Sequence, residues 1–150
     1  MSAPYAEASA LKVGDALPSF ETEPLSRLTL ALYCGASGDH NPIHVDSDFA
    51  RAAGVPDVFV HGMLSMAWLG RLMTNWVPQS ALRELSVRFV AITRVGERIT
   101  CAGRVTGWQE HAGERCARVE ITTTNQHGEP RLSGEALVAL GRHGSNDPIK

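Results

Sequence analysis

Apolar and polar residues alternate along the second half of the chain. Beyond Glu84 the apolar residues recur at every second position in four runs, which is the spacing of half-buried β-strands. The runs cover residues 85–91, 99–105, 119–123 and 132–140. Three segments with a turn-forming glycine, RVGE, EHAGE and NQHGE, separate them. Four consecutive strands joined by short loops predict an antiparallel meander.

The first half follows helical spacing instead. The segment PLSRLTLALYCGAS predicts a short helix that has Ser26 as its N-cap and ends near Gly35. The segment DSDFARAAG predicts a second short helix, capped by Asp46 or Ser47 and stopped by Gly54.

A longer helix is predicted between these two parts, from Gly62 to Trp76, with Pro78 closing it off. Its few polar residues leave the first two turns apolar nearly all round, so the helix is expected to be buried on most sides. One buried helix followed by a meander predicts an α+β fold in which a sheet wraps around a central helix. A helix lying on one face of an open sheet would show a cleaner polar stripe.

Length and composition limit the class of protein. A chain of 150 residues predicts a single domain, 1–150, with loose polar ends near 1–10 and 142–150. The net charge of -2 provides no basic face for nucleic acid. Three cysteines without a C-x-x-C pair predict reduced thiols and a cytoplasmic location. No signal peptide is recognisable, and no apolar stretch reaches the roughly 18 residues of a membrane span.

The loop SGDHNPIHVD carries the first candidate chemistry. Asp39 and His44 supply a carboxylate and an imidazole, the side chains best suited to moving protons near neutral pH. Asn41 precedes a proline and therefore avoids the helical region, which keeps this loop extended or turned and lets it direct both side chains into one space. The same residues also make a good polar turn in which Asp39 only accepts from backbone amides, so both readings stay open.

Two other kinds of site are weaker on the sequence. A metal site would use four residues, Asp39, His44, Asp46 and His61, but they follow no usual zinc spacing, and no metal is predicted. A nucleophile would be Cys34 or Ser65. The first lacks an evident activating partner and the second lies inside the buried helix, so both are interpreted as packing residues.

The HGM segment adds a second candidate group. Gly62 begins the central helix, and the first amides of a helix have no partner within it and lie at its positive dipole end. A ligand carbonyl oxygen could accept from the N–H of Gly62, and a glycine lets that ligand approach closely. The alternative is a glycine required only by the turn, with His61 packed or capping.

These motifs together resemble a known family. The segment YCGASGDHNPIHVD followed by HGML resembles the signature of MaoC-like dehydratases, the (R)-specific enoyl-CoA hydratases of the hydratase 2 group. The similarity extends from LKVGDALP near the start, through VRFVAI and GERIT, to LSGEALVAL.

The resemblance implies a hot-dog fold, a homodimer joined sheet edge to sheet edge, and active sites near the interface. It implies hydration of a trans-2-enoyl-CoA to an (R)-3-hydroxyacyl-CoA, without a separate cofactor because coenzyme A belongs to the substrate. Asp39 and His44 would be the catalytic pair, holding one water, and the backbone N–H of Gly62 would hold the thioester carbonyl.

The resemblance also suggests residues that bind the substrate. Asn41 is expected to orient the loop or donate to the site. Met63 is a candidate for the wall of the acyl cavity, with Met66, Trp68 and Leu69 behind it. Arg88 or Arg94 is expected to meet the coenzyme A phosphates, because the planar guanidinium fork grips phosphate well.

Three rival functions remain. A 3-hydroxyacyl-ACP dehydratase would keep the fold and chemistry, use a protein-bound substrate and pair with a second hot-dog chain. A hot-dog thioesterase would place its acid on other motifs, which this sequence lacks. A noncatalytic acyl-binding subunit would be expected to have lost the acid–histidine pair, which this chain retains.

Overall fold

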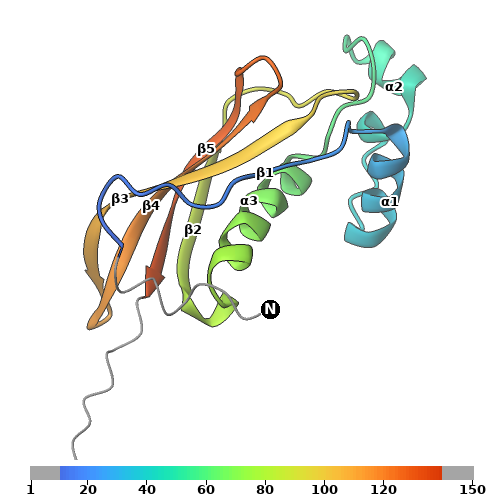
Figure 1. The fold of residues 1–150 in the computed structure, drawn as a ribbon. Helices are drawn as coiled ribbons and strands as arrows, with labels where there is room; N and C mark the ends of the chain where they lie inside the picture. The colour runs from blue at the N-terminus through green and yellow to red at the C-terminus, as the bar shows by residue number, and fades with distance from the viewer. Residues whose placement is uncertain (1–10, 140–150) are drawn as a thin grey trace, which may run out of the picture.

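The computed structural model describes residues 11–139 as a five-stranded antiparallel sheet with one long helix against it (Figure 1). The elements, in chain order, are β1 (Phe20–Glu21), α1 (Arg27–Ser37), the 3₁₀ turn η2 (Pro42–His44), α2 (Ser47–Ala52), α3 (Gly62–Trp76), the 3₁₀ turn η3 (Gln79–Ala81), β2 (Leu82–Phe89), β3 (Ile99–His111), β4 (Glu114–Asn125) and β5 (Pro130–Ala139). The predicted loose ends, 1–10 and 142–150, lie outside the described residues.

The order of strands across the sheet is β1-β3-β4-β5-β2. The predicted four-strand meander is therefore wrong in one respect: β3, β4 and β5 follow one another, but β2 pairs with β5 rather than with β3. The RVGE segment is part of a crossover, residues 90–98, which carries the chain from one side of the sheet to the other. Alternation identifies strands and their faces, whereas the choice of neighbour depends on distant contacts.

Strand β1 was not predicted. It has only two residues and pairs antiparallel with β3, with Phe20 opposite Cys101. Two residues are too few to show an alternating pattern, so the sequence carried no signal for this strand.

Helix α3 has the predicted bounds, Gly62 to Trp76. It packs against the sheet. Its residues Leu69, Leu72 and Met73 are buried in the hydrophobic core together with the inward-facing residues of β3, β4 and β5. Its predicted burial on most sides is only partly right for the single chain, because Met63 is 56% exposed and Arg71 also faces solvent. On its first turns Gly62, Met63 and Ala67 are exposed, whereas Leu69, Leu72 and Met73 farther along are buried.

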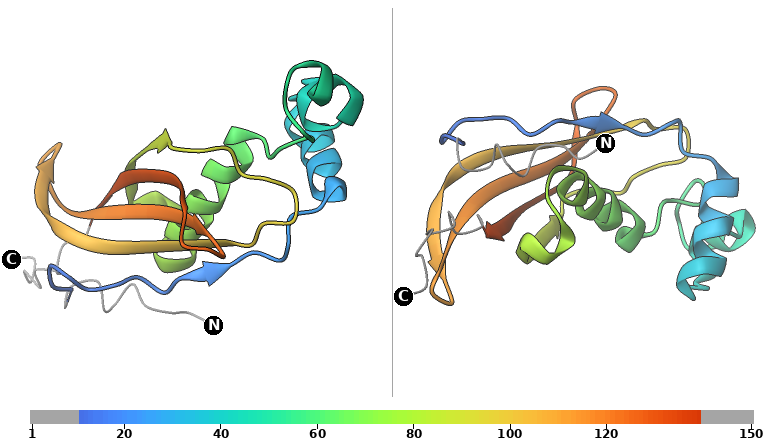
Figure 2. Two further views of the ribbon diagram at one scale, coloured as in Figure 1. Left: turned by 90° about the horizontal axis from the view of Figure 1, so that it is seen from above. Right: turned by 60° about the horizontal axis from the view of Figure 1, so that its bottom comes forward.

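Helices α1 and α2 lie together beyond the sheet, at the end where α3 begins (Figure 2). Ser26 caps α1 as predicted, since its hydroxyl accepts from the N–H of Thr29 at 3.1 Å. The helix continues past Gly35 to Ser37, because the residue with the left-handed φ of 75° is Gly38. Asp46, the first of the two predicted caps, accepts from two amides of α2.

Close packing of β2 on β5 depends on one glycine. A Cβ added at Gly134 would lie 2.1 Å from the carbonyl oxygen of Ser86, so a larger residue would force the strands apart. The end of β2, at Phe89, lies beside Gly62, the first residue of α3. None of the helices within residues 11–139 is both long and apolar enough to span a membrane.

Candidate active site

The loop between α1 and α2 is rigid for local reasons. Asn41 is the N-cap of η2, and its side-chain oxygen accepts from the N–H of Ile43 at 3.2 Å. Asp39 accepts in turn from the N–H of Asn41 at 3.3 Å, while its own N–H donates to the Ser37 hydroxyl at 3.1 Å. The predicted turn chemistry is thus present, and it leaves the exposed Asp39 carboxylate with further lone pairs to use.

His44 stands at the end of η2 and is only 8% exposed. Its Nδ1 lies 2.8 Å from the carbonyl oxygen of Phe59. Because a carbonyl oxygen only accepts, Nδ1 must carry the proton, and Nε2 of the neutral ring is left as a proton acceptor. The hydrogen bond therefore determines both the tautomer and the orientation of the imidazole.

His61, the residue before α3, lies against this ring. The two imidazoles stack with centroids 4.0 Å apart and planes 27° apart, and Tyr33 of α1 contacts His61 edge-on at 4.9 Å. The Nε2 atom of His61 donates to the backbone carbonyl of Asp39 at 3.3 Å. His61 thus ties the candidate acid's backbone to the candidate histidine's ring, a role that the sequence analysis did not identify.

The environment of His61 keeps it neutral. Burial is the largest effect and lowers the pKa of His61, and the neighbouring His44 lowers it further, against an opposing influence of Asp39. The ring has no exposed surface, and its Nδ1 has no hydrogen-bond partner within the described part of the chain. A neutral ring beneath His44 adds no positive charge to the site.

Asp39, His44 and His61 bring one ligand-type atom each within 4.8 Å of one another. This is the metal candidate of the sequence analysis without Asp46, whose carboxylate instead caps α2. Lone pairs of stacked imidazoles lie in nearly parallel planes, so they do not converge on one tetrahedral ion. The arrangement suits proton transfer between neighbouring groups better than metal binding.

Gly62 begins α3 next to these side chains. Among residues 11–139, no hydrogen bond satisfies its N–H, and His61 provides no side-chain cap. The φ of Gly62 is not positive, so its backbone conformation does not require glycine, contrary to the turn-only alternative. The missing side chain instead lets the Phe89 ring pack closely, since a Cβ at position 62 would lie 3.1 Å from that ring.

A cavity of about 340 Å³ opens at this end of α3. Its lining is mostly apolar and comes from the segment before α3, the start of α3, the end of β2, the crossover and β5. The lining residues are Phe59, Val60, Gly62, Ser65, Phe89, Val90, Ala91, Ile92, Thr93 and Leu132. Ser65 was interpreted as a packing residue, and it is buried but contributes to this wall. Met63 lies beside Gly62 and is exposed, outside the lining.

Arg88 is not brought to this cavity. It is exposed in β2 opposite Ser133, and it lines a separate polar hollow with Arg118 and Glu120. Its neighbours in the strand, Val87 and Phe89, point toward α3, so Arg88 points to the other face of the sheet. Arg94 is nearer the site because its backbone pairs with Phe59, which both supports His44 and lines the cavity.

Residues 11–127 match the MaoC like domain family. The chain belongs to the MaoC-like domain family. The family was predicted from the GDHNPIH and HGML segments, and this prediction is confirmed.

Relatives of this family member include named hydratases and dehydratases. The chain is 29% identical to the (R)-specific enoyl-CoA hydratase of Rhodospirillum rubrum, over 80% of this chain and 83% of that protein. It is 29% identical to the mitochondrial 3-hydroxyacyl-[acyl-carrier-protein] dehydratase of Arabidopsis thaliana, over 87% of this chain and 78% of that protein. It is 35% identical to the fatty acid synthase subunit beta of Gibberella zeae, but spans only 6% of that much longer protein.

The solved structure of the (R)-hydratase from A. caviae involved in PHA biosynthesis has the same architecture. It superposes with a TM-score of 0.76 at 26% identity, over 88% of this chain and 98% of that one. The predicted hot-dog fold is therefore confirmed.

Proposed function

We propose that this MaoC-like protein catalyses the reversible, (R)-specific hydration of trans-2-enoyl-CoA to (R)-3-hydroxyacyl-CoA. One observation carries the proposal: ligand-type atoms of Asp39 and His44 lie within 4.8 Å, beside the N–H of Gly62 at the start of α3, which no group within residues 11–139 satisfies. The named hydratase and dehydratase relatives support this class of reaction.

The thioester carbonyl accepts from the N–H of Gly62 in this proposal. Negative charge moves onto that oxygen when a nucleophile adds to C3, so a donor held in place there acts on the transition state more than on the ground state. The positive end of the α3 dipole adds to the effect. Residue 62 carries no Cβ of its own beside this amide, which favours close approach of the carbonyl.

One water lies between Asp39 and His44. One group of the pair takes a proton from this water while the water oxygen bonds to C3 and the C2=C3 electrons move toward the thioester. The pair then delivers a proton to C2 as the enolate collapses. The sum is one OH at C3 and one H at C2, and the pair regains its starting protonation. Dehydration uses the same groups in reverse order.

The acyl chain runs into the apolar cavity between α3 and the crossover. Asn41 keeps the catalytic loop in its turn by capping η2, and it remains a proposed contact of the substrate. Met63 is proposed to cover the entrance rather than the wall. The coenzyme A phosphates are proposed to meet Arg94, with Arg88 as the alternative on the far face of the sheet. No separate cofactor takes part.

The second candidate is a 3-hydroxyacyl-ACP dehydratase, favoured by the similarity to the plant mitochondrial dehydratase. It uses the same groups on a protein-bound substrate. The ratio of kcat/KM on crotonyl-CoA to kcat/KM on crotonyl-ACP distinguishes a CoA hydratase from an ACP dehydratase. A tenfold preference for one carrier corresponds to about 1.4 kcal/mol of differential transition-state binding. A thioesterase would release free thiol, and a noncatalytic acyl-binding subunit would turn over neither substrate.

The protein is proposed to be a homodimer. One edge of the sheet, at β2, is open within the described residues, and apolar side chains at that end are exposed, namely Met63, Phe89, Val90 and Ile92. A second copy paired along this edge would cover both features and remove an edge prone to aggregation. Sedimentation equilibrium should give twice the mass of the 16.2 kDa chain. A monomer active alone contradicts the dimer, and a monomer active only with another hot-dog chain indicates a heteromer.

Loss of enoyl absorbance on adding the purified chain to crotonyl-CoA, followed by chiral analysis, tests the activity. The expected product is (R)-3-hydroxybutyryl-CoA. Asp39→Asn should lower kcat by about 10²–10⁴-fold, because the amide cannot exchange the proton. Asp46→Asn is the matched control, since asparagine caps a helix as well as aspartate. Full activity in Asp39→Asn would contradict the mechanism.

A further inference from the structure

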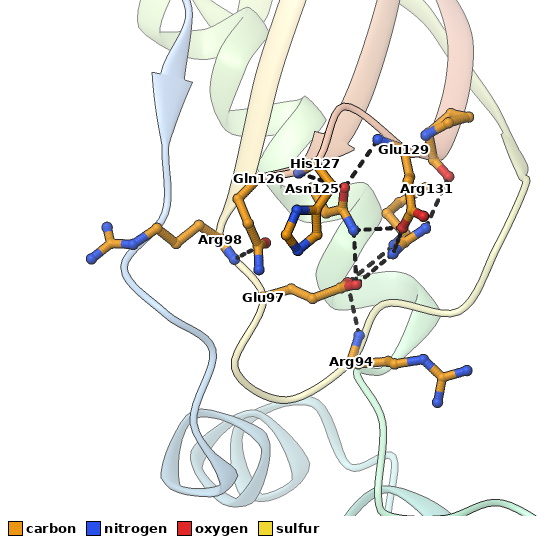
Figure 3. Close-up of polar contacts among 9 residues, drawn as sticks. Arg94, Glu97, Arg98, Asn125, Gln126, His127, Glu129 and Arg131 are labelled. Atoms are coloured by element: carbon orange, nitrogen blue, oxygen red, sulfur yellow. Dashed lines mark hydrogen bonds and ion pairs between the residues drawn. The ribbon is translucent and has the colours of Figure 1, made fainter.

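The crossover 90–98 is held at both ends by one residue. At its start, the carbonyl oxygen of Arg131 accepts from the N–H groups of Val90 at 2.8 Å and Ala91 at 3.2 Å. At its end, the guanidinium of Arg131 binds the Glu97 carboxylate through two nitrogens, with Nε at 3.0 Å from Oε2 and Nη2 on Oε1. Arg131 in β5 thus closes the crossover into a loop of defined shape. Figure 3 shows its contacts with Glu97.

The Glu97–Arg131 pair is buried and fully bonded. The side chains are 10% and 9% exposed. Glu97 also accepts from the N–H of Arg94 at 3.0 Å and from the amide of Asn125 at 3.1 Å, and Glu129 adds a second carboxylate to Arg131 at 2.9 Å. Burial by itself raises the pKa of Glu97, but the hydrogen bonds from Arg131 and the Arg94 amide outweigh it and lower that pKa to about 2. The pair stays charged throughout any practical assay range.

A buried ion pair gives little net stability over an apolar pair of the same size. Its geometric effect is larger, because a bidentate guanidinium–carboxylate pair fixes distance and orientation together. Glu97 is therefore a fixed anchor, and the turn from Arg94 to Glu97 is built on it.

The anchored segment supports the candidate active site in two ways. Val90, Ala91, Ile92 and Thr93 form one wall of the cavity. The segment also contacts the chain just before α3: the N–H of Val60 donates to the Thr93 carbonyl at 3.0 Å, and the backbone of Arg94 pairs with that of Phe59. The carbonyl of Phe59 in turn accepts from His44.

We propose that the Glu97–Arg131 pair is a positioning device for the active site, an inference that rests on the proposed function. The pair holds the cavity wall 90–93 in place. Through the pairing of Arg94 with Phe59 and the carbonyl of Phe59, it also holds the ring of His44. Neither residue contacts the proposed reacting atoms.

Glu97→Gln tests the device with little change in volume. The amide nitrogen cannot accept, so the bonds from Arg131 and from the N–H of Arg94 cannot all be kept. Small displacements of catalytic groups are costly, so kcat/KM on crotonyl-CoA should fall about 10- to 100-fold. The fall should divide between a lower kcat, from His44, and a higher KM, from the cavity wall. Assays run well below the melting temperature of each variant.

Glu114→Gln is the matched control. Glu114 also binds an arginine through both oxygens, with Arg83 Nε at 2.5 Å and Nη2 at 3.1 Å, and it also joins two strands. Its partner Arg83 lies at the other end of β2 from Phe89, six residues away and therefore roughly 20 Å distant at about 3.3 Å per residue. The kcat and KM of Glu114→Gln should match those of the wild type.

Amide hydrogen exchange provides a readout independent of turnover. The amides of Val60, Val90 and Ala91 should exchange faster in Glu97→Gln than in the wild type. In Glu114→Gln they should exchange at the wild-type rate. A variant with a lower melting temperature but wild-type kcat, KM and exchange at these amides would overturn the inference and leave only a stabilising role.

A double variant covers the case in which Glu97→Gln does not fold. Glu97→Leu combined with Arg131→Met leaves no buried unpaired charge, because the side chain of Glu129, the other partner of Arg131, is 60% exposed, so the variant is expected to fold. It should still show the loss of kcat/KM, and wild-type kinetics in this variant would overturn the positioning role. If the wild type itself hydrates no enoyl thioester, the proposed function fails, while the exchange experiment still decides whether the pair positions the wall.

Discussion

His44 donates from Nδ1 to the carbonyl oxygen of Phe59 at 2.8 Å, across fifteen residues of chain. This contact determines which nitrogen of the imidazole is free to exchange a proton. It also joins the two segments that carry the candidate site, the turn η2 and the approach to α3.

Replacing His44 tests the histidine of the pair. His44→Gln should lower kcat by about 10²–10⁴-fold, because glutamine keeps a donor for the Phe59 carbonyl but cannot take a proton. His40→Gln is the matched control, since His40 is an exposed histidine of the same loop. Steady-state hydration of crotonyl-CoA measures both, and equal losses in the two variants would argue against a specific role of His44.

A methyl group at position 62 should block the amide. The new Cβ of Gly62→Ala would lie 3.1 Å from the Phe89 ring and would narrow the approach of the thioester carbonyl. We expect kcat/KM to fall about 10- to 100-fold, comparable with loss or displacement of a transition-state donor. Combining Gly62→Ala with Phe89→Leu removes the contact between the new Cβ and the Phe89 ring but keeps the methyl group beside the amide of residue 62. Recovery of full kcat/KM in the double variant would show that packing, rather than access to the amide, was the cause.

His61 should make the fold sensitive to mild acid. Burial lowers the pKa of His61 in the folded chain, so below pH 6.5 the unfolded chain binds more protons than the folded one. Above pH 6.5 this titration does not change the free energy of unfolding. As the pH drops from 6.5 toward the pKa of His61 in the folded chain, the free energy of unfolding falls by at most about 1.4 kcal/mol per pH unit for one proton. Urea unfolding at pH 7.5 and 5.5 measures this fall.

The variant His61→Gln should show a smaller fall between the two pH values, because its amide keeps a donor for the Asp39 carbonyl and does not titrate. His127→Gln, at an exposed histidine, should behave as the wild type. An identical fall in His61→Gln and in the wild type would contradict the assignment.

Glu97 should contribute stability that disappears in strong acid. Its pKa is lowered from 4.5 to about 2, so the contribution is present above pH 4.5 and is lost as the pH falls through 2. At pH 7 Glu97→Gln should reduce the free energy of unfolding by about 3 kcal/mol. The gap between variant and wild type should close as the pH approaches 2. Denaturant unfolding at several pH values checks this, and a gap independent of pH would exclude the ion pair as its source.

Local patterns in the sequence predicted much of this molecule. The bounds of α3 and the caps at Ser26 and Asp46 depend on residues a few positions apart, so periodicity and capping chemistry were sufficient. Alternation likewise predicted the presence of β2, β3, β4 and β5, though not their bounds. The pairing of Asp39 with His44 across a turned loop is local for the same reason. The family could be recognised because GDHNPIH and HGML are continuous segments.

Only the tertiary structure determined the contacts between distant positions. The placing of β2 beside β5, the stacking of His61 on His44 and the binding of Glu97 to Arg131 join distant segments. Leu82 and Val138 of the first pair are 56 residues apart in the sequence, and Glu97 and Arg131 are 34 apart. A sequence pattern identifies which face of an element is apolar, but not which element covers it. That choice is made by packing of the whole chain, where burial of many side chains together outweighs any local preference.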